Sequence, residues 1–422
     1  MPDLYAPASS GIPAPTRPQP VGSPPWRSHK AVRTSSRAPA GGTRTPAKSR
    51  DLYLDLLRAL ALGRVVLNHL FGWVWLPIVF PSMGVMFALA GALMARSLAR
   101  PALSVIRSRL RRLLPPLWLM AALLVPLMVW QGWVPSHSHD PARWWLKLAF
   151  WVLPLSDPPF PQHLPRIPGL LDAYWGEHAA GPLWYLRAYL WFVLLSPLLL
   201  KVVRKVPWVA ILTPLSMCFF LDAWIIDPPE RVYANLAGFA TYGSCWILGM
   251  AFNEGLFQRI RRFMIPSTVP FVMLATFWWA WNHPADGTTR LDLDQTASTQ
   301  ALWSLGFVLL LLNVSPSWHS WPLKLEKWSG LITLLNARAV TVYLWHNLAL
   351  TVALELSNLL WYVHPVAQNV PWLLDSNAIG FLLTVPMIAL SILLFGWFED
   401  VAAKRPVRLF PWPHRQHGGR QT

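Results

Sequence analysis

Two ionisable residues, Arg58 and His69, lie eleven positions apart in the first long apolar stretch of the chain, LDLLRALALGRVVLNHL. Eleven helical steps of about 100° return to within roughly 20° of the starting face, about 16 Å further along, so one helix face carries both side chains. A guanidinium group can hold phosphate, and an imidazole shielded from water can act as a general base. The spacing therefore predicts a reaction channel, with Arg58 at its cytoplasmic mouth and His69 deeper. In the structural alternative, Arg58 reaches the lipid headgroups and His69 bonds a neighbouring helix.

Three further arginines are candidates for ligand binding. Arg109 and Arg112 belong to the basic run RSRLRR at the cytoplasmic end of the third apolar stretch, where guanidinium groups suit phosphates. The same run would also serve as a plain cytoplasmic anchor. Arg187 follows Trp184 in the outer half of a later stretch, where a charge needs a partner such as Glu177 or a ligand. We expect a structural pair for Arg187, and a channel or acceptor role for Arg187 and Trp184 stays open.

A second histidine inside an apolar stretch is His346, which follows Tyr343 in the ninth. Two interpretations stay open for it. It lines the channel together with Tyr343 as a second acid or base, or it makes an interhelical hydrogen bond. Glu399, near the cytoplasmic end of the last stretch, is expected to cap a helix or to pair with Lys404 or Arg405.

The outer loop over residues 131–182 carries several side chains of the types that bind metals. They are His137, His139, Asp140, His163, Glu177 and His178. Their spacing matches no zinc signature, and the many prolines of the loop instead predict a rigid cover over an acceptor site. The sequence also has no glycine-rich phosphate loop, nucleophile elbow or dinucleotide fingerprint. We therefore expect no metal and no cofactor.

The composition places these residues in a membrane. Of 422 residues, 54% are hydrophobic and only 13% are charged, against roughly 25% charged in a soluble globular chain. Soluble α/β enzymes, fibrous proteins and disulfide-built domains are therefore excluded. The two cysteines, Cys218 and Cys245, lie in apolar runs and are expected to be core residues.

Ten stretches are long and apolar enough to span a bilayer. They are about 54–76, 83–99, 113–131, 183–200, 206–226, 233–253, 264–281, 299–314, 338–362 and 375–397. We predict an all-α integral membrane protein with about ten transmembrane helices and with both termini in the cytoplasm. We expect three parts along the chain: a disordered basic tail (1–50), the transmembrane domain (51–400) and a second basic tail (401–422).

The basic residues support this topology. With the N-terminus inside, the segments predicted to be cytoplasmic hold 28 of the 36 Lys and Arg residues, and the outer segments hold five. This split follows the positive-inside rule at every loop. The net charge of +17 therefore reflects topology and attraction to anionic lipids, and it does not indicate nucleic acid. The expected surrounding partner is a lipid bilayer.

The segment RDLYLDLLRALALGRVVLNHL, with Arg58 and His69, resembles the opening helix of the membrane-bound acyltransferase 3 family, whose signature is Arg or Glu, ten residues and His. Five later segments are similar to family elements in the same order: MFALAGALM, RSRLRRLLPPLW, GPLWYLRAYLWFVLLSPLL, VYLWHNLAL and WFEDVAAKRPVRL. The resemblance covers about residues 51–410. One departure is Ala90 before Gly91, where the family usually has Ser.

The resemblance implies an acyl-CoA-dependent O-acyltransferase. Acyl-CoA, the co-substrate, would donate an acyl group, often acetyl, to a hydroxyl of a glycan, glycolipid or secondary metabolite. Arg58 would hold the polar end of acyl-CoA, His69 would deprotonate the acceptor or carry the acyl group, and Arg109 and Arg112 would bind CoA phosphates. We expect the standalone form, without an extracytoplasmic hydrolase-like domain, in a bacterial plasma membrane.

A transporter or flippase of a glycan or lipid precursor is the rival interpretation. Charged residues inside the membrane and aromatic loops are equally typical of such carriers. Carriers commonly show paired sequence repeats, and this chain has none that we detect. Release of free CoA by the purified protein would separate the two classes.

Overall fold

The described part of the protein is built of helices. The computed structural model describes residues 51–135, 141–223, 225–226, 228–283, 292–293, 296–316, 318, 320–409 and 411. Within these ranges there is no β-strand, and Ile167 and Leu171 form an isolated bridge. The predicted tail over residues 1–50 and residues 412–422 of the second tail lie outside the described residues. The all-α class predicted from the sequence is confirmed.

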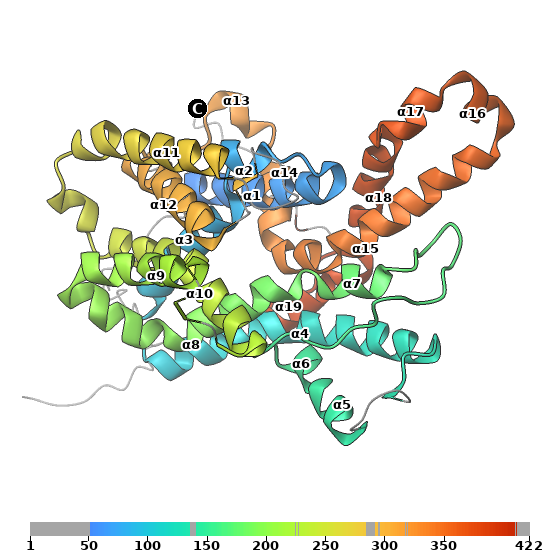
Figure 1. Ribbon diagram of the computed structural model, residues 1–422, viewed down its shortest axis with the longest axis horizontal. Coiled ribbons are helices and arrows are strands. Elements are labelled where there is room, and N and C mark those ends of the chain that lie inside the picture. Colours follow the sequence, from blue (N-terminus) through green and yellow to red (C-terminus); the bar gives the residue numbers. More distant parts are fainter. Residues whose placement is uncertain are drawn as a thin grey trace, which may run out of the picture. The chain divides into compact units, whose positions relative to one another are not determined.

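Each of the ten predicted stretches contains a long helix (Figure 1). These helices are α1 (Leu52–Phe71), α3 (Ser82–Ser97), α4 (Ala102–Trp130), α8 (Leu183–Lys205), α9 (Pro207–Asp222), α10 (Glu230–Asn253), α11 (Met264–Asn282), α12 (Ala297–Asn313), α15 (Ala339–Asn358) and α18 (Ala378–Phe395).

Six segments of the described chain are long and apolar enough to cross a membrane. They are Leu76–Ser97, Ala102–Trp130, Trp175–Lys205, Met264–Asn282, Ala339–Tyr362 and Ala378–Phe395. The apolar helices α9 and α12 are shorter, with 16 and 17 residues, and α1 carries Asp55, Arg58 and Arg64. The protein is therefore a multi-pass membrane protein, and the count of ten spans and the side of the termini stay predictions.

Shorter helices join the long ones. They are α2 (Leu76–Val79), α5 (Pro141–Lys147), α6 (Ala149–Val152), α7 (Trp175–Ala180), η2 (Leu256–Arg259), α13 (Leu323–Glu326), α14 (Ser329–Ala337), η4 (Leu359–Tyr362), α16 (His364–Asn369), α17 (Pro371–Asp375) and α19 (Trp397–Ala403). Two of them, α14 and α19, matter for the site, because α14 packs against α1 and α19 packs against α4. The last described helix, α19, is thereby brought beside α4.

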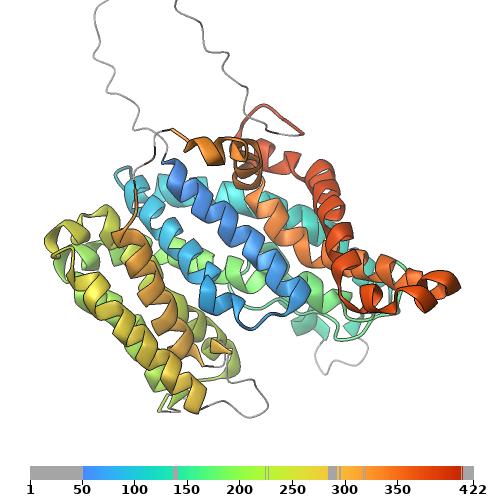
Figure 2. The same ribbon diagram turned by 90° about the horizontal axis from the view of Figure 1, so that it is seen from above.

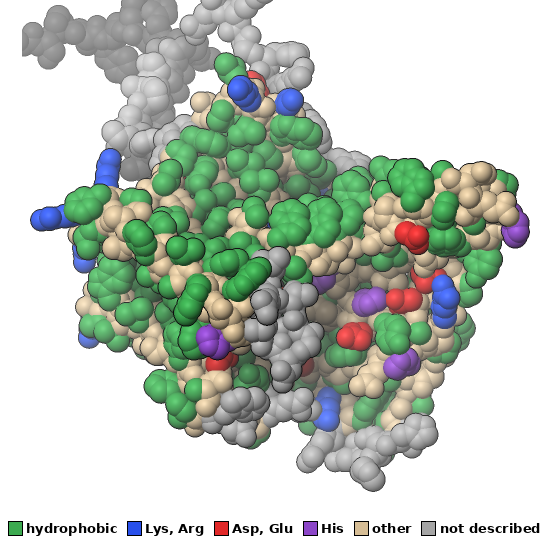
Figure 3. All heavy atoms as spheres, turned by 45° about the horizontal axis from the view of Figure 1, so that its top comes forward, with side chains coloured by type: hydrophobic (Ala, Val, Ile, Leu, Met, Phe, Trp, Pro, Cys, Tyr) green, Lys and Arg blue, Asp and Glu red, His purple; other side chains and the backbone are tan. Residues whose placement is uncertain are grey.

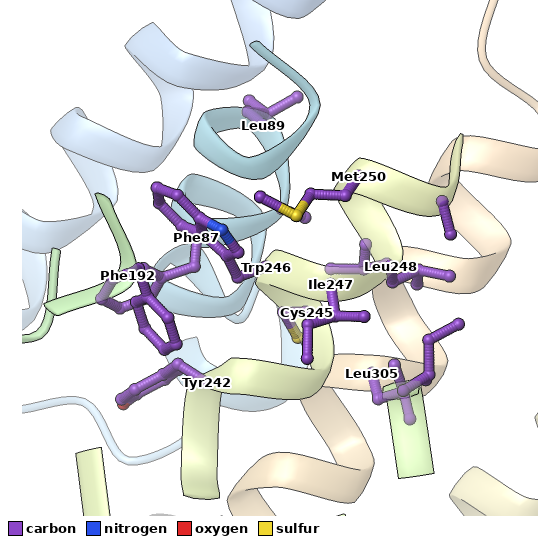
Figure 4. Packing of buried hydrophobic residues seen from close by; sticks show 14 of the residues in the cluster. Phe87, Leu89, Phe192, Tyr242, Cys245, Trp246, Ile247, Leu248, Met250 and Leu305 are labelled. Carbon is purple, nitrogen blue, oxygen red and sulfur yellow. The ribbon is translucent and has the colours of Figure 1, made fainter. Parts of the chain in front are cut away.

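Helices α3 and α10 approach closely because each presents a glycine to the other's backbone. A Cβ atom on Gly91 would collide with the carbonyl oxygen of Trp246, and a Cβ atom on Gly249 would collide with that of Ala88. The Trp246 indole stacks on the Phe192 ring with the centroids 5.1 Å apart, inside a fully buried apolar cluster (Figure 4). Gly91 therefore serves the packing that fixes α3.

Helix α1 lies between two parts of the core. It begins at Asp51, whose carboxylate accepts a hydrogen bond from the Tyr53 N–H, and it ends at Gly72 in the left-handed conformation (φ 61°). Its side chains enter both apolar clusters, with Leu57 in the first and Val65 in the second. Figure 2 shows α1 beside α3 and α15, which both pack against it. Residues along α1 therefore face different surroundings at its two ends.

Much of the outer surface is hydrophobic. Phe271 and Trp278 on α11 are 72% and 61% exposed, and Leu382 and Val385 on α18 are 68% and 58% exposed. Figure 3 shows such side chains spread widely over one face. An apolar surface of this extent is typical of contact with lipid.

Candidate functional site

A cavity of about 640 Å³ lies at the end of the bundle that is predicted to face the cytoplasm. We call it the arginine cavity because five arginines line it: Arg58, Arg109, Arg112, Arg405 and Arg408. Its volume falls in the range of roughly 300–1,000 Å³ that is usual for small-molecule sites. The structure thus places the three arginines singled out from the sequence for binding acyl-CoA in one cavity and adds two from the C-terminal segment.

Arg58 is held in place but stays accessible from the arginine cavity. Its Nη1 donates to Asn336 Oδ1 at 3.1 Å and lies 3.4 Å from Asp55 Oδ1, and its side chain is 27% exposed. The Asn336 amide is itself fixed, because its Nδ2 donates to the backbone carbonyl of Asp55 at 2.8 Å. The guanidinium is therefore oriented before any ligand arrives.

Arg109 and Arg112 come from consecutive turns of α4. Arg109 Nη2 donates to Ser97 Oγ on α3 at 3.1 Å, which orients its planar fork. Arg112 lies near enough to Arg109 and Arg405 for their like charges to repel one another. A phosphate-bearing ligand would relieve this repulsion, and paired N–H groups of guanidinium suit phosphate oxygens.

A buried ion pair fixes the C-terminal segment at the rim of this cavity. Arg338, which is fully buried, donates from Nη2 to Asp400 Oδ2 at 2.6 Å and also to the backbone carbonyl of Arg408. The same Asp400 Oδ2 accepts from the Arg408 N–H at 3.0 Å, and the Arg405 N–H donates to the Asp400 carbonyl at 2.8 Å. Arg405 and Arg408 thereby line the arginine cavity although they follow the last long helix.

Two neighbouring carboxyl groups of α19, those of Glu399 and Asp400, line the cavity, and their pKa values are shifted in opposite directions. Glu399 Oε1 accepts from the backbone N–H and the hydroxyl of Thr341, at 2.7 Å and 2.6 Å, so it caps the first turn of α15. Burial raises the pKa of Glu399 to about 7, although Thr341 and Arg338 oppose the shift. Burial also opposes ionisation of Asp400, but the hydrogen bonds from Arg338 and from the Arg408 N–H outweigh it and hold that pKa below its usual value.

His69 and His346 lie side by side, with ring centroids 5.1 Å apart. His346 is buried, and its Nδ1 lies 2.6 Å from the backbone carbonyl oxygen of Tyr343. A carbonyl only accepts, so Nδ1 carries the proton and Nε2 of the neutral ring carries the lone pair. This buried Nε2 makes no hydrogen bond within the described residues. His69, in contrast, is accessible through the cavity that it lines.

His69 lines a second cavity of about 180 Å³, which we call the His69 cavity. Other residues on its walls include Arg64, Asn68, Trp184, Gln300, Trp303 and Tyr343. Trp184, a predicted acceptor residue, therefore lies in the same cavity as His69. Arg58 does not line this cavity, although it shares a helix with His69.

Tyr343 lines both cavities. Its side chain is almost fully buried, and its ring centroid lies 4.9 Å from that of Tyr185 and 5.6 Å from that of His346. Tyr343 is therefore the residue that the arginine cavity and the His69 cavity share.

Arg187 has a structural partner. It is buried, it forms an ion pair with Asp157, and its Nη2 donates to the backbone carbonyl of Ala234 at 3.2 Å. The partner comes from the outer loop in place of the expected Glu177, and Arg187 lines neither of the two cavities described above.

The outer loop contributes no metal site in the part of the chain that the structure describes. His137, His139 and Asp140 lie outside the described residues. His178 Nδ1 instead lies 2.9 Å from the hydroxyl oxygen of Thr351 on α15 and 3.5 Å from Asp172 Oδ2. These contacts tie the loop to the helix that carries His346.

Comparison with known proteins bears on the chemistry of these cavities. The acyltransferase 3 family model, described as an acyltransferase domain, matches residues 51–396. The chain belongs to this acyltransferase family. No curated protein and no solved structure matches the chain. The acyltransferase match includes both histidines, Arg58 and the basic run of α4, whereas Arg405 and Arg408 follow it.

Several residues that line these two cavities were not singled out from the sequence. Arg405 and Arg408 looked like part of an anchoring tail, and Gln300 and Trp303 lie in an ordinary apolar stretch. For Arg405 and Arg408 the sequence offered one signal, since Asp400 precedes both arginines in the motif WFEDVAAKRPVRL. For Gln300 and Trp303 on α12 it offered none.

Proposed function

We propose that the protein is an acyl-CoA-dependent O-acyltransferase that moves an acyl group, acetyl in the simplest case, to a hydroxyl of a glycan, glycolipid or secondary metabolite. The supporting observation is that the arginine cavity and the His69 cavity meet at Tyr343 in a chain of this family. The first cavity suits a phosphate-rich donor and the second presents a base. Acyl-CoA is a co-substrate, and the proposed location is a bacterial plasma membrane.

The donor would bind with its phosphates among the guanidinium groups. Arg58 is oriented by Asn336, and Arg109 by Ser97, so both forks lose little freedom on binding a phosphate. The thioester would extend from the arginine cavity past Tyr343 toward His69.

The acceptor hydroxyl would be activated by His69. The imidazole takes the hydroxyl proton as the oxygen forms a bond to the thioester carbonyl carbon, and the carbon–sulfur bond then breaks. The CoA thiolate leaves and takes up a proton, so an ester and free CoA are the products. The nearby His346, oriented by the Tyr343 carbonyl, would stabilise the charge that develops on His69.

An acyl-histidine relay is the mechanistic alternative. In this route a ring nitrogen of His69 attacks the thioester carbonyl, CoA leaves, and the acceptor hydroxyl then takes the acyl group from the imidazole. The exposure of His69 allows both routes. A burst of free CoA without acceptor, one equivalent per protein, is expected only from the relay.

Free CoA is also the product that separates the enzyme from a carrier. The purified full-length protein in detergent would receive acetyl-CoA and a crude membrane extract as acceptor, and thiol release would be followed with a colorimetric reagent. Cys218 and Cys245 are buried, so the protein's own thiols contribute a low background. Acceptor-dependent release supports the proposal. No release with any acceptor, from a folded protein, would favour the transporter or flippase.

A further inference from the structure

The His69 cavity is lined by the opposite end of α1 from the arginine cavity. Its walls include Pro77 and Pro81, between the first two predicted spans, and Leu293, which precedes α12. Both segments are predicted to be outside, because they connect odd-numbered to even-numbered spans. The donor and a second ligand would therefore approach Tyr343 from opposite sides of the membrane.

The volume of the His69 cavity limits what it can hold. At about 180 Å³ it is smaller than the roughly 300–1,000 Å³ of sites for drug-sized ligands. A single six-membered ring with its substituents fits this space. A whole macrolide or a lipid chain does not.

Two fixed indole rings give the cavity flat apolar walls. Trp184 stacks on Tyr242 with centroids 5.5 Å apart and an interplanar angle of 27°. Trp303 Nε1 donates to the backbone carbonyl of Ile78 at 3.1 Å, which fixes the second ring. Rigid aromatic faces bind the apolar faces of a ring at a small cost in conformational entropy.

The polar groups of the cavity are mostly uncharged. Asn68 and Gln300 contribute amides and Ser304 contributes a hydroxyl, and each of these groups can donate and accept hydrogen bonds. Arg64 Nη1 already donates to Ser82 Oγ at 3.0 Å. No carboxylate is among the described residues that line the cavity. This set suits a neutral ligand with several hydroxyl groups, and it does not suit an amine.

We propose that the His69 cavity binds one neutral hydroxylated ring of the acceptor, of hexopyranose size, from the side opposite to the arginines, and that Gln300 and Trp303 of α12 determine its specificity. This inference rests on the proposed function, since His69 on the cavity wall is the base that would meet a ring hydroxyl. Trp303 would stack on the ring, and Gln300 would hydrogen-bond hydroxyl groups away from the reacting one.

The test measures the Michaelis constants of the full-length protein in detergent for both substrates. The acceptor probes are methyl glycosides of glucose, mannose and galactose, and the donor is acetyl-CoA. Gln300→Ala removes a hydrogen bond, which contributes about 0.5–1.5 kcal/mol, so the acceptor KM is expected to rise about twofold to tenfold. Trp303→Leu is expected to raise it further, and the KM for acetyl-CoA is expected to stay within twofold of wild type in both variants.

Asn313→Ala provides the matched control, because it removes an amide at the far end of the same helix, about 20 Å away along the axis. Its acceptor KM should equal that of the wild type. If the wild type turns over with a membrane extract but with none of the three glycosides, or if Gln300→Ala and Trp303→Leu match the control, this inference is overturned and the proposed function stands. If the wild type releases no CoA with any acceptor, the proposed function itself fails.

Discussion

Removal of the Arg58 guanidinium should weaken acyl-CoA binding by a predictable factor. A hydrogen bond to a charged group contributes about 1.5–3 kcal/mol, which corresponds to roughly tenfold to 150-fold in Kd. The Arg58 side chain is 27% exposed, so water screens part of this interaction. The bond to Asn336 at 3.1 Å orients the group in advance and partly offsets the screening. We expect a rise in Kd of about tenfold to thirtyfold for Arg58→Ala.

The assay is calorimetric titration of the purified protein with CoA, which binds without turnover. Arg58→Lys should recover little affinity, because a point charge replaces a planar fork. Arg204→Ala is the control, since Arg204 pairs with Glu254 at 2.7 Å and lies outside the arginine cavity. Thermal unfolding of each variant checks that the protein still folds when Asp55 and Asn336 lose their contact with the Arg58 guanidinium. A Kd for Arg58→Ala within twofold of the wild type, in a folded protein, would refute the assignment of this cavity to the donor.

Three further predictions concern the fold and its surroundings. Glu399→Gln should raise the melting temperature at pH 8 and change it little near pH 5. The pKa of Glu399 is about 7 in the folded protein and 4.5 ordinarily, so its contribution to stability is lost as pH rises through this range. Equal shifts at both pH values would contradict the buried setting. Gly91→Ala should cost about 1–3 kcal/mol of stability by overpacking against the Trp246 carbonyl, and an unchanged melting temperature would show that α3 can move away. A cysteine at Asn369, which is exposed and lies in the outer loop between the last two predicted spans, should react with an impermeant thiol reagent in whole cells and one at Ser104 should not; labelling of both would disprove the ten-span topology.

The helices were the most predictable part of the fold. Apolar runs of about 20 residues leave a chain in lipid few structures other than a helix, and each predicted run contains one in the structure. The number of membrane spans is harder to predict than the helices, because α9 and α12 are short and α1 carries charges. The arginine cavity could also be predicted in part, since basic clusters gather at the predicted cytoplasmic ends of spans and Arg58, Arg109 and Arg112 share one cavity.

Other parts of the site depend on contacts between distant segments. Arg405 and Arg408 reach the arginine cavity because Asp400 pairs with Arg338, 62 residues earlier. The partner of Arg187 is Asp157, from an irregular loop whose path no periodic pattern describes. The position of Tyr343 between two cavities depends on how α1, α8 and α15 pack. Local spacing contains no information on any of these three arrangements.

We expect His69 to do the chemistry and His346 to support it. His69→Ala should reduce acceptor-dependent CoA release by at least about a hundredfold, since a general base contributes typically 10²–10⁴-fold and an obligatory acyl-histidine would make the loss larger. His346→Asn should keep more activity than His69→Ala and should lower the melting temperature, because it disturbs the bond to the Tyr343 carbonyl.

The most direct measurement compares His69→Ala with His163→Ala at equal abundance in the membrane. His163 is an exposed histidine of the outer loop that lines neither of the two cavities described, so its removal controls for the loss of any imidazole. Release of free CoA from acetyl-CoA, with and without acceptor, is followed for both variants. We expect near-normal release from His163→Ala and at least a hundredfold less from His69→Ala. Near-normal acceptor-dependent release from His69→Ala would show that His69 is not the catalytic base.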